Sequence, residues 1–232
     1  MPPPSPQDIR LLIFDLDGTL IDSKLDLALS VNHMSVEMGR GTLDHSTIFS
    51  YVGRGAPLLV RRVLGVPSPE EPVSDVEVEK GLEIFLNYYR DHMLDNTVTY
   101  PGVREALDTL KAEGGHTLAV LTNKPVRFSR EILKGLGLSH HFVEVYGGNS
   151  FEVKKPDPVG IRKLLEDTGA GPRETMIVGD SDTDVLTGRN AGVWTCGVTY
   201  GFGSYTLPQA PPDFLLDNLR ELPPLLNGYP KN

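Results

Sequence analysis

Short apolar runs that each end at polar residues recur along this chain, and they constrain its fold more than any other feature. Three of them are continuous and rich in β-forming residues; with the residue that ends each, they are 11–14 (Asp15), 116–121 (Thr122) and 175–178 (Gly179-Asp180). Such runs are typical of strands that are buried on both faces of a parallel sheet. The runs 193–198 and 214–216 predict a fourth and a fifth strand.

Helical patterns fill most of the segments between these strands. The segment 101–111 begins with Pro101, which suits the first turn of a helix, and it is followed by Gly114-Gly115 as a stop. Similar patterns predict helices at 125–136, 158–167 and 184–190. Because strand and helix alternate, we expect an α/β fold with a right-handed, doubly wound parallel sheet.

Residues 24 to 95 interrupt this alternation. Amphipathic patterns predict helices at 25–38, 57–64 and 76–93, with no strand between them. The sequence therefore predicts a core domain of residues 1–22 and 96–232 and a helical domain of residues 23–95, inserted after the first strand.

Length and charge exclude several classes of protein. The chain has 232 residues, which suffices for a large core without disulfides, and it contains a single cysteine. Its formal net charge of −9 repels nucleic-acid backbones and anionic lipid surfaces. No secretory signal or membrane span is evident in the sequence. We expect a cytoplasmic protein, monomeric or homodimeric, that binds neither nucleic acid nor membrane.

The polar residues that follow the strands are expected to meet at one edge of the sheet, because the carboxyl ends of parallel strands form the ligand crevice. Carboxylates that converge there repel one another unless positive charge lies between them. A lysine and a divalent cation would supply that charge, and an all-oxygen site with room for water is typical of Mg²⁺. The expected substrate is therefore a phosphate ester.

The pair Asp15 and Asp17 suggests how such an ester could be cleaved. Residues two apart at the end of a strand share a face. Asp15 could therefore attack phosphorus while Asp17 protonates the departing alkoxide and then deprotonates the attacking water.

Four motifs occur in order along the chain: Asp15-x-Asp17-Gly-Thr, Thr122, Lys155-Pro156 and Gly179-Asp180-Ser181-x-x-Asp184. Together they resemble the motifs of the haloacid dehalogenase superfamily, and the helical insertion resembles its C1-type cap. The segments 52–57, 122–125 and 198–201 are similar to the phosphoglycolate phosphatase branch of that superfamily. The resemblance covers essentially the whole core.

This resemblance implies a role for each motif. Asp15 is the implied nucleophile and a metal ligand, Asp17 the acid/base and a ligand through its backbone carbonyl, and Asp180 the third protein ligand. The remaining implied roles belong to residues that assist them: Thr122 and the Asn123 backbone hold phosphoryl oxygens, Lys155 neutralises Asp15 and phosphate, and Asp184, with Ser181, supports the metal shell. The adjacent Lys154 is the alternative to Lys155.

Other polar residues receive different interpretations. Arg54, flanked by two glycines in the insertion, could recognise an anionic group at the far end of the substrate or could be an exposed loop residue. His140-His141 is interpreted as a solvated loop pair. The segment 200–203 could line the site, but a glycine-rich turn is the favoured interpretation.

The favoured function is a Mg²⁺-dependent phosphatase for a small phosphorylated metabolite, with phosphoglycolate first. The alternatives are a phosphomutase of the β-phosphoglucomutase type and a phosphatase for another sugar phosphate or a nucleotide. A dehalogenase is disfavoured because that chemistry needs neither Asp17 nor Asp180. A receiver-type signalling domain is disfavoured because its acidic pair and its acceptor lie on different strands.

Overall fold

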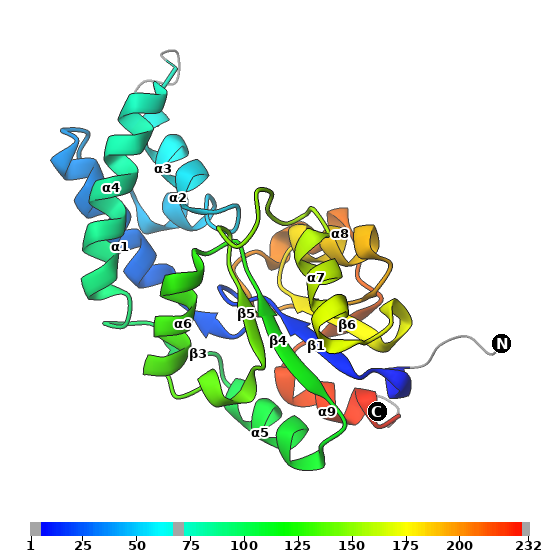
Figure 1. Cartoon of the computed structure of the whole chain (residues 1–232). Coiled ribbons are helices and arrows are strands. Elements are labelled where there is room, and N and C mark those ends of the chain that lie inside the picture. Colours follow the sequence, from blue (N-terminus) through cyan, green and yellow to red (C-terminus); the bar gives the residue numbers. More distant parts are fainter. Residues whose placement is uncertain (1–5, 67–71, 229–232) are drawn as a thin grey trace. The chain divides into compact units, whose positions relative to one another are not determined.

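The computed structural model describes residues 6–66 and 72–228, and the chain divides into two compact units (Figure 1). Unit 1 comprises residues 1–21 and 99–232, and unit 2 comprises residues 22–98. The boundaries fall within β2 (Ile21–Asp22) and β3 (Val98–Thr99), which pair as a small sheet of their own.

Unit 1 is built on a parallel sheet, so the predicted α/β class is confirmed. In spatial order, the strands found among the described residues are β5 (Glu144–Tyr146), β4 (Thr117–Leu121), β1 (Leu11–Phe14), β6 (Thr175–Gly179), β7 (Trp194–Val198) and β8 (Phe214–Leu216). The sequence did not predict β5, because its three residues include a glutamate and are too short to form an apolar run.

The central strand of the sheet, β1, is completely apolar. Every residue of β1 is buried, and β1 pairs in parallel with β4 on one side and β6 on the other. One face of the sheet forms a core cluster with α7 (Val159–Thr168). Its buried residues come from three strands, from α7 and from the residue before β7: Leu11, Ile13, Ala119, Leu121, Ile177, Ile161, Leu164 and Val193. Burying this surface is the main free-energy gain that fixes the positions of the strand ends.

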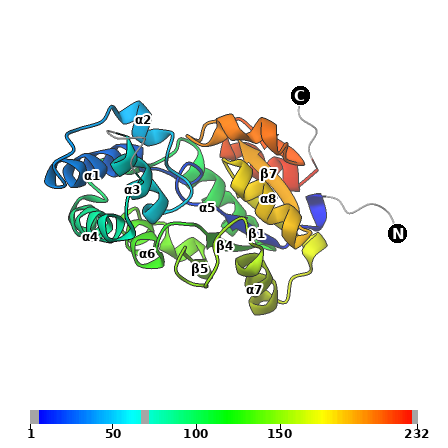
Figure 2. The ribbon, with the colours of Figure 1, turned by 90° about the horizontal axis from the view of Figure 1, so that it is seen from above.

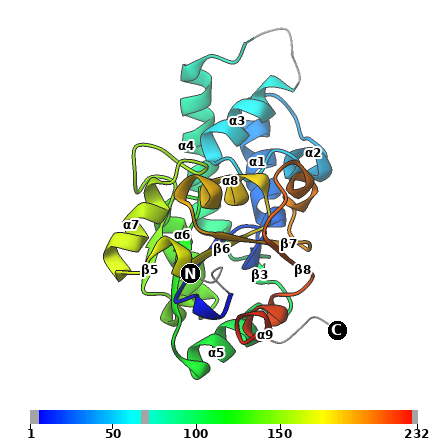
Figure 3. The ribbon, with the colours of Figure 1, turned by 90° about the vertical axis from the view of Figure 1, so that its right-hand side faces the viewer.

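The other helices of unit 1 surround this sheet. They are α5 (Val103–Glu113), α6 (Val126–Gly135), α8 (Asp182–Ala191) and α9 (Leu222–Leu226). Figures 1 and 3 show α5 beside α9. Short 3-10 helices lie in the connections: η1 (Pro6–Asp8), η2 (Ser139–His141), η3 (Pro172–Glu174), η4 (Ser204–Gln209) and η5 (Leu219–Glu221).

Unit 2 is helical, and Figure 2 shows its helices as one group. They are α1 (Lys24–Glu37), α2 (His45–Phe49), α3 (Ala56–Gly65) and α4 (Asp75–His92). A capping box of Ser74 and Glu77 begins α4. The sequence did not predict α2, because five residues are too few to show a helical period. No helix of the two described ranges is long and apolar enough to cross a membrane.

Candidate active site

The central strands bring three of the predicted motifs to one edge of the sheet. Asp15 follows β1, Thr122 follows β4 and Asp180 follows β6, and these three strands are neighbours. Phe14 is in register with both Val120 and Val178, and the Asp15 backbone N–H donates to the Val178 carbonyl over 2.9 Å. Asp15 is therefore held at the carboxyl edge by the backbone pairing of the strands.

Three buried carboxylates and one buried lysine form the centre of this edge, and we call them the strand-end cluster. One carboxylate oxygen from each of Asp15, Asp180 and Asp184 lies within 4.8 Å of the others. Lys155 Nζ lies 2.8 Å from an oxygen of Asp15 and 2.6 Å from an oxygen of Asp184. Three carboxylates face one ammonium here, a formal excess of two negative charges.

Burial and like charge shift the pKa values in this cluster. Burial raises the pKa of Asp15 to about 6 against the opposing effect of Lys155, and the charge of Asp184 adds to the rise. Burial, then the charges of Asp184 and Asp15, raise the pKa of Asp180 well above its usual range. Burial disfavours the charged form of Lys155, but the carboxylates of Asp15 and Asp184 outweigh it and raise its pKa.

The start of α8 orients Asp184. Ser181 is the N-cap of this helix, and its hydroxyl donates to one Asp184 oxygen over 2.7 Å. Lys155 donates to the other oxygen over 2.6 Å. Both oxygens of Asp184 are therefore held, and a hydrogen-bonded chain runs from Ser181 through Asp184 to Lys155.

Asn123 fixes the backbone of Lys155. Its side-chain amide donates to the Lys155 carbonyl over 3.2 Å, and its carbonyl oxygen accepts from the Lys155 backbone N–H over 3.0 Å. The structure buries Lys155 and leaves the adjacent Lys154 exposed. From the sequence, only the backbone of Asn123 was expected to contribute to the site, so this side-chain contact was not predicted.

Lys124 is a further buried lysine to which the sequence analysis assigned no role. Its Nζ donates to both carboxylate oxygens of Asp17, over 3.0 and 3.1 Å, and its side chain is 4% exposed. Thr122 is buried beside it, and its hydroxyl accepts from the Lys124 backbone N–H over 3.2 Å. The signal in the sequence was its place in the loop after β4, two residues beyond a predicted site residue.

Glycines allow the backbone to approach Asp180 closely. A Cβ atom on Gly18 would lie 2.2 Å from Asp180 Oδ2, and one on Gly201 would lie 2.2 Å from Asp180 Cβ. The Gly203 backbone N–H donates to Asp180 Oδ2 over 2.7 Å. The segment 200–203 is a turn, as expected, and it also packs against the Asp180 carboxylate, as the alternative interpretation allowed.

The side chains of the strand-end cluster fit a hard divalent cation. Their possible ligand atoms are all carboxylate oxygens, and their formal excess negative charge equals the charge of one such ion in size. The close approach of Gly18 to Asp180 also places the Asp17–Gly18 peptide beside this carboxylate. Asp17 itself turns its carboxylate to Lys124.

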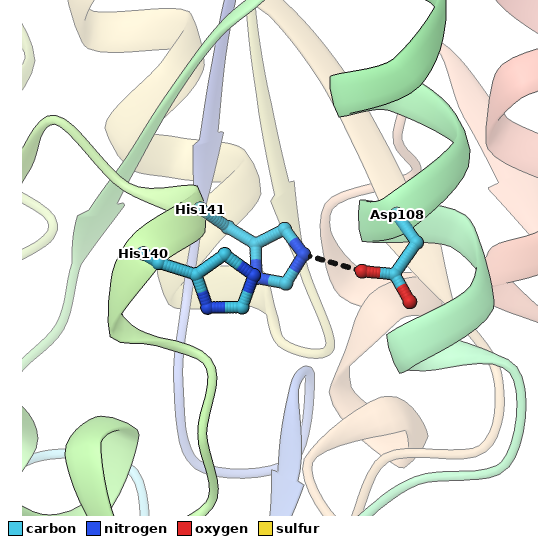
Figure 4. Close-up of side chains that lie close together, drawn as sticks. All are labelled: Asp108, His140 and His141. Atoms are coloured by element: carbon cyan, nitrogen blue, oxygen red, sulfur yellow. Dashed lines mark hydrogen bonds and ion pairs between the residues drawn. The ribbon is translucent and has the colours of Figure 1, made fainter.

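Two further features were predicted from the sequence. Arg54 is an exposed residue between α2 and α3, and Gly53 and Gly55 on either side have φ angles of 111° and 90°. The interpretation of His140-His141 as a solvated pair is wrong for His141. Its ring is buried and lies 2.7 Å from an oxygen of Asp108 (Figure 4).

Comparison with known proteins places this site in a family. The family described as haloacid dehalogenase-like hydrolase matches residues 12–198. The chain therefore belongs to the haloacid dehalogenase-like hydrolases, and the resemblance found in the sequence is confirmed.

Its relatives include phosphoglycolate phosphatases. The one from Pseudomonas fluorescens (strain Pf0-1) is 40% identical, and the match covers 93% of this chain and 79% of the relative. The one from Haemophilus influenzae (strain Rd) is 37% identical over 92% of this chain and 96% of the relative. The crystal structure of a predicted phosphoglycolate phosphatase from Haemophilus somnus is 32% identical, with a TM-score of 0.86 over 93% of this chain and 96% of that one. The chain is thus a hydrolase related to phosphatases of this kind.

Proposed function

We propose that this chain is a Mg²⁺-dependent phosphatase that hydrolyses a small phosphate monoester, phosphoglycolate above others, through an aspartyl-phosphate. The observation that carries the proposal is the strand-end cluster, in which Lys155 joins Asp15 to Asp184 beside Asp180. Phosphoryl transfer depends on position and on neutralised charge. The cluster fixes the position of Asp15, and Lys155 together with a divalent cation would neutralise the charge.

Asp15 is the nucleophile in this proposal. Its carboxylate oxygen attacks phosphorus, and the bond between phosphorus and the alkoxide breaks. Lys155, 2.8 Å from Asp15, orients the carboxylate and neutralises charge on the phosphoryl group. Thr122 and the backbone of Asn123, at the end of the adjacent strand, would hold phosphoryl oxygens.

Asp17 transfers the protons. It protonates the departing alkoxide, then takes a proton from the water that attacks the aspartyl-phosphate, which releases inorganic phosphate and restores Asp15. Lys124 is a positioning residue in this step, because its ammonium contacts both oxygens of Asp17 and holds that carboxylate in one orientation.

Mg²⁺ would be held by the Asp15 and Asp180 carboxylates and the Asp17 backbone carbonyl, and it would supply positive charge that stabilises the transferred phosphoryl group. Asp184, fixed by Ser181, would support this site through Lys155. The names of the relatives favour phosphoglycolate as the substrate. A phosphomutase remains the second candidate, since both aspartates serve that chemistry as well.

The test is release of inorganic phosphate from a panel of phosphomonoesters with Mg²⁺. We expect phosphoglycolate to give the highest kcat/KM and the Asp15→Asn variant to give no turnover. Asp17→Asn should retain the first step and accumulate a phosphoenzyme, detectable by intact-protein mass spectrometry. Near wild-type hydrolysis by purified Asp15→Asn would refute the nucleophile, and isomerised sugar phosphate without release of phosphate would indicate the mutase.

A further inference from the structure

We propose a second metal site, for a transition-metal ion of the Zn²⁺ class, at Asp108, His140 and His141, which we call the histidine cluster. Asp108 lies on α5 and the two histidines end η2 (Figure 4). One possible ligand atom from each residue lies within 4.8 Å of the others. This site is separate from the strand-end cluster and does not depend on the proposed function.

The surroundings of His141 carry the proposal, because both of its ring nitrogens face oxygen acceptors. Nδ1 lies 3.2 Å from the Leu138 carbonyl oxygen, and Nε2 lies 2.7 Å from Asp108 Oδ1. A neutral imidazole has one N–H, so it can satisfy only one of these oxygens. A cation bound at Nε2 would replace the direct contact with Asp108 and take the carboxylate as its second ligand.

The Leu138 contact selects which nitrogen faces the cation. An Nδ1–H that donates to a backbone carbonyl leaves the lone pair of Nε2 directed at Asp108. Histidines that bind metals commonly use this arrangement, in which a carbonyl fixes the tautomer and the other nitrogen coordinates. The His141 ring is completely buried, so it provides one ligand in a fixed position.

The other two ligands are exposed and can adjust. The Asp108 carboxylate is 59% exposed, and the His140 ring is exposed, 3.9 Å from the His141 ring between centroids. Their exposure allows these two side chains to adjust around an ion beside the fixed His141 ring.

The backbone that carries these residues is already tied together. Lys111, one turn after Asp108 on α5, donates its Nζ to the His140 carbonyl over 2.8 Å. This bond holds η2 against α5, so the metal need not organise the segment from a disordered state. Two imidazole nitrogens and one carboxylate with a position open to water form a set that Zn²⁺ accepts, whereas Mg²⁺ prefers oxygen ligands alone.

The histidine cluster lies on connections that lead into strands, whereas the strand-end cluster lies where strands end. α5 precedes β4, and η2 precedes β5. The two sites are therefore at opposite edges of the parallel sheet, and occupation of one does not require ligands of the other.

Titration of the full chain with Co²⁺, in the presence of excess Mg²⁺, tests this site. Co²⁺ substitutes for Zn²⁺, and in a four-coordinate site with nitrogen ligands it absorbs visible light strongly, unlike Co²⁺ in an octahedral oxygen site. We expect this absorption to saturate at one ion per chain and to disappear when Zn²⁺ is added. Zn²⁺ should also raise the melting temperature of the protein.

Exposed positions provide variants that keep the fold. Asp108→Asn and His140→Gln should each weaken Zn²⁺ binding by at least about 10- to 100-fold, the loss typical even of a supporting contact at a metal site. His92→Gln is the matched control, because His92 also faces a carboxylate, that of Asp95, over 2.7 Å. Phosphate release with Mg²⁺ should be unchanged in all three variants.

Two results would overturn the proposal. One is wild-type protein without the strong Co²⁺ absorption, which would mean that His141 and Asp108 form only a hydrogen-bonded pair. The other is wild-type affinity for Zn²⁺ in both Asp108→Asn and His140→Gln, or an equal loss in His92→Gln, which would place the bound ion elsewhere.

Discussion

Two buried lysines in the candidate active site each contact a different aspartate. Lys155 contacts Asp15, whereas Lys124 contacts Asp17. The two aspartates are only two residues apart, but each has its own ammonium. A nucleophile and a proton donor need different orientations, and separate partners allow each carboxylate to be held independently.

Lys124→Met should lower kcat by about 10- to 100-fold, within the range that general acid–base catalysis contributes. Without the ammonium, Asp17 loses the contacts that orient it as an acid. The loss should be larger for ethyl phosphate, whose alkoxide must be protonated, than for p-nitrophenyl phosphate, whose leaving group departs as an anion. Steady-state kinetics on both substrates measure this difference.

Lys124→Arg is the control, since it keeps a positive donor and should recover part of the activity. An equal loss on both substrates, without recovery in the arginine variant, would mean that Lys124 only maintains the loop after β4.

Arg54→Ala should lower kcat/KM for phosphoglycolate by about 10- to 100-fold and change it little for p-nitrophenyl phosphate, which lacks a distal anion. An arginine fork binds a carboxylate through two hydrogen bonds, and a charge-assisted hydrogen bond contributes about 1.5–3 kcal/mol. A similar decrease for both substrates would leave Arg54 without a part in selectivity.

Residue types and spacing predicted which side chains could act, but not all of their contacts. The positions after β1, β4 and β6 could be predicted because parallel strands bring their carboxyl ends together. The contacts of Lys124 with Asp17, and of the Asn123 side chain with Lys155, join residues far apart in the sequence. No local pattern encodes such pairs, because they depend on the final positions of two loops.

At the level of the elements, helix ends were predictable where proline or glycine marks them. The segment expected at 158–167 is α7 at Val159–Thr168, with Gly169 as its left-handed C-cap. The short elements α2 and β5 were missed, because a few residues provide no period. The hydrogen bond between Ser181 and Asp184 has two effects: it caps the start of α8, and it orients the Asp184 carboxylate in the site.

A buried carboxylate also connects the first and last segments of unit 2. Asp26 on α1 is 1% exposed and accepts hydrogen bonds from the backbone N–H groups and side chains of Asn96 and Thr97, over 2.7 to 3.0 Å. These contacts fix the place where the chain leaves this unit relative to the place where it enters.

Asp26→Ala should therefore lower the free energy of unfolding by about 1–3 kcal/mol or more, because it leaves buried donors without acceptors. Urea denaturation followed by circular dichroism measures the change. Asp91→Ala, at an exposed position of α4, is the matched control and should change stability by less than about 0.5 kcal/mol. Equal denaturation midpoints for the two variants would contradict the role of Asp26.

For the whole molecule, the concentration of negative charge at the strand-end cluster should make the stability of the fold depend on a bound cation. The chain carries a formal net charge of −9, and an excess of two negative charges is buried at the strand-end cluster. Buried like charges cost free energy in the folded state, and a divalent cation removes that cost. The ion that the proposed reaction needs should therefore also stabilise the fold.

Mg²⁺ at about 100 times its dissociation constant should stabilise the protein by about 2.7 kcal/mol, which corresponds to a rise in melting temperature of roughly 5–10 °C for a chain of this size. Asp180→Asn should lose most of this rise, and a chelator should abolish phosphate release. Ca²⁺ should also stabilise the protein but inhibit it, because its larger and looser shell lets Asp15 bind side-on instead of facing phosphorus. Thermal scans and phosphate release, measured on the same samples, separate binding of the ion from its use in catalysis. Full activity in the chelator, or an unchanged Mg²⁺ effect in Asp180→Asn, would show that the strand-end cluster does not hold the ion.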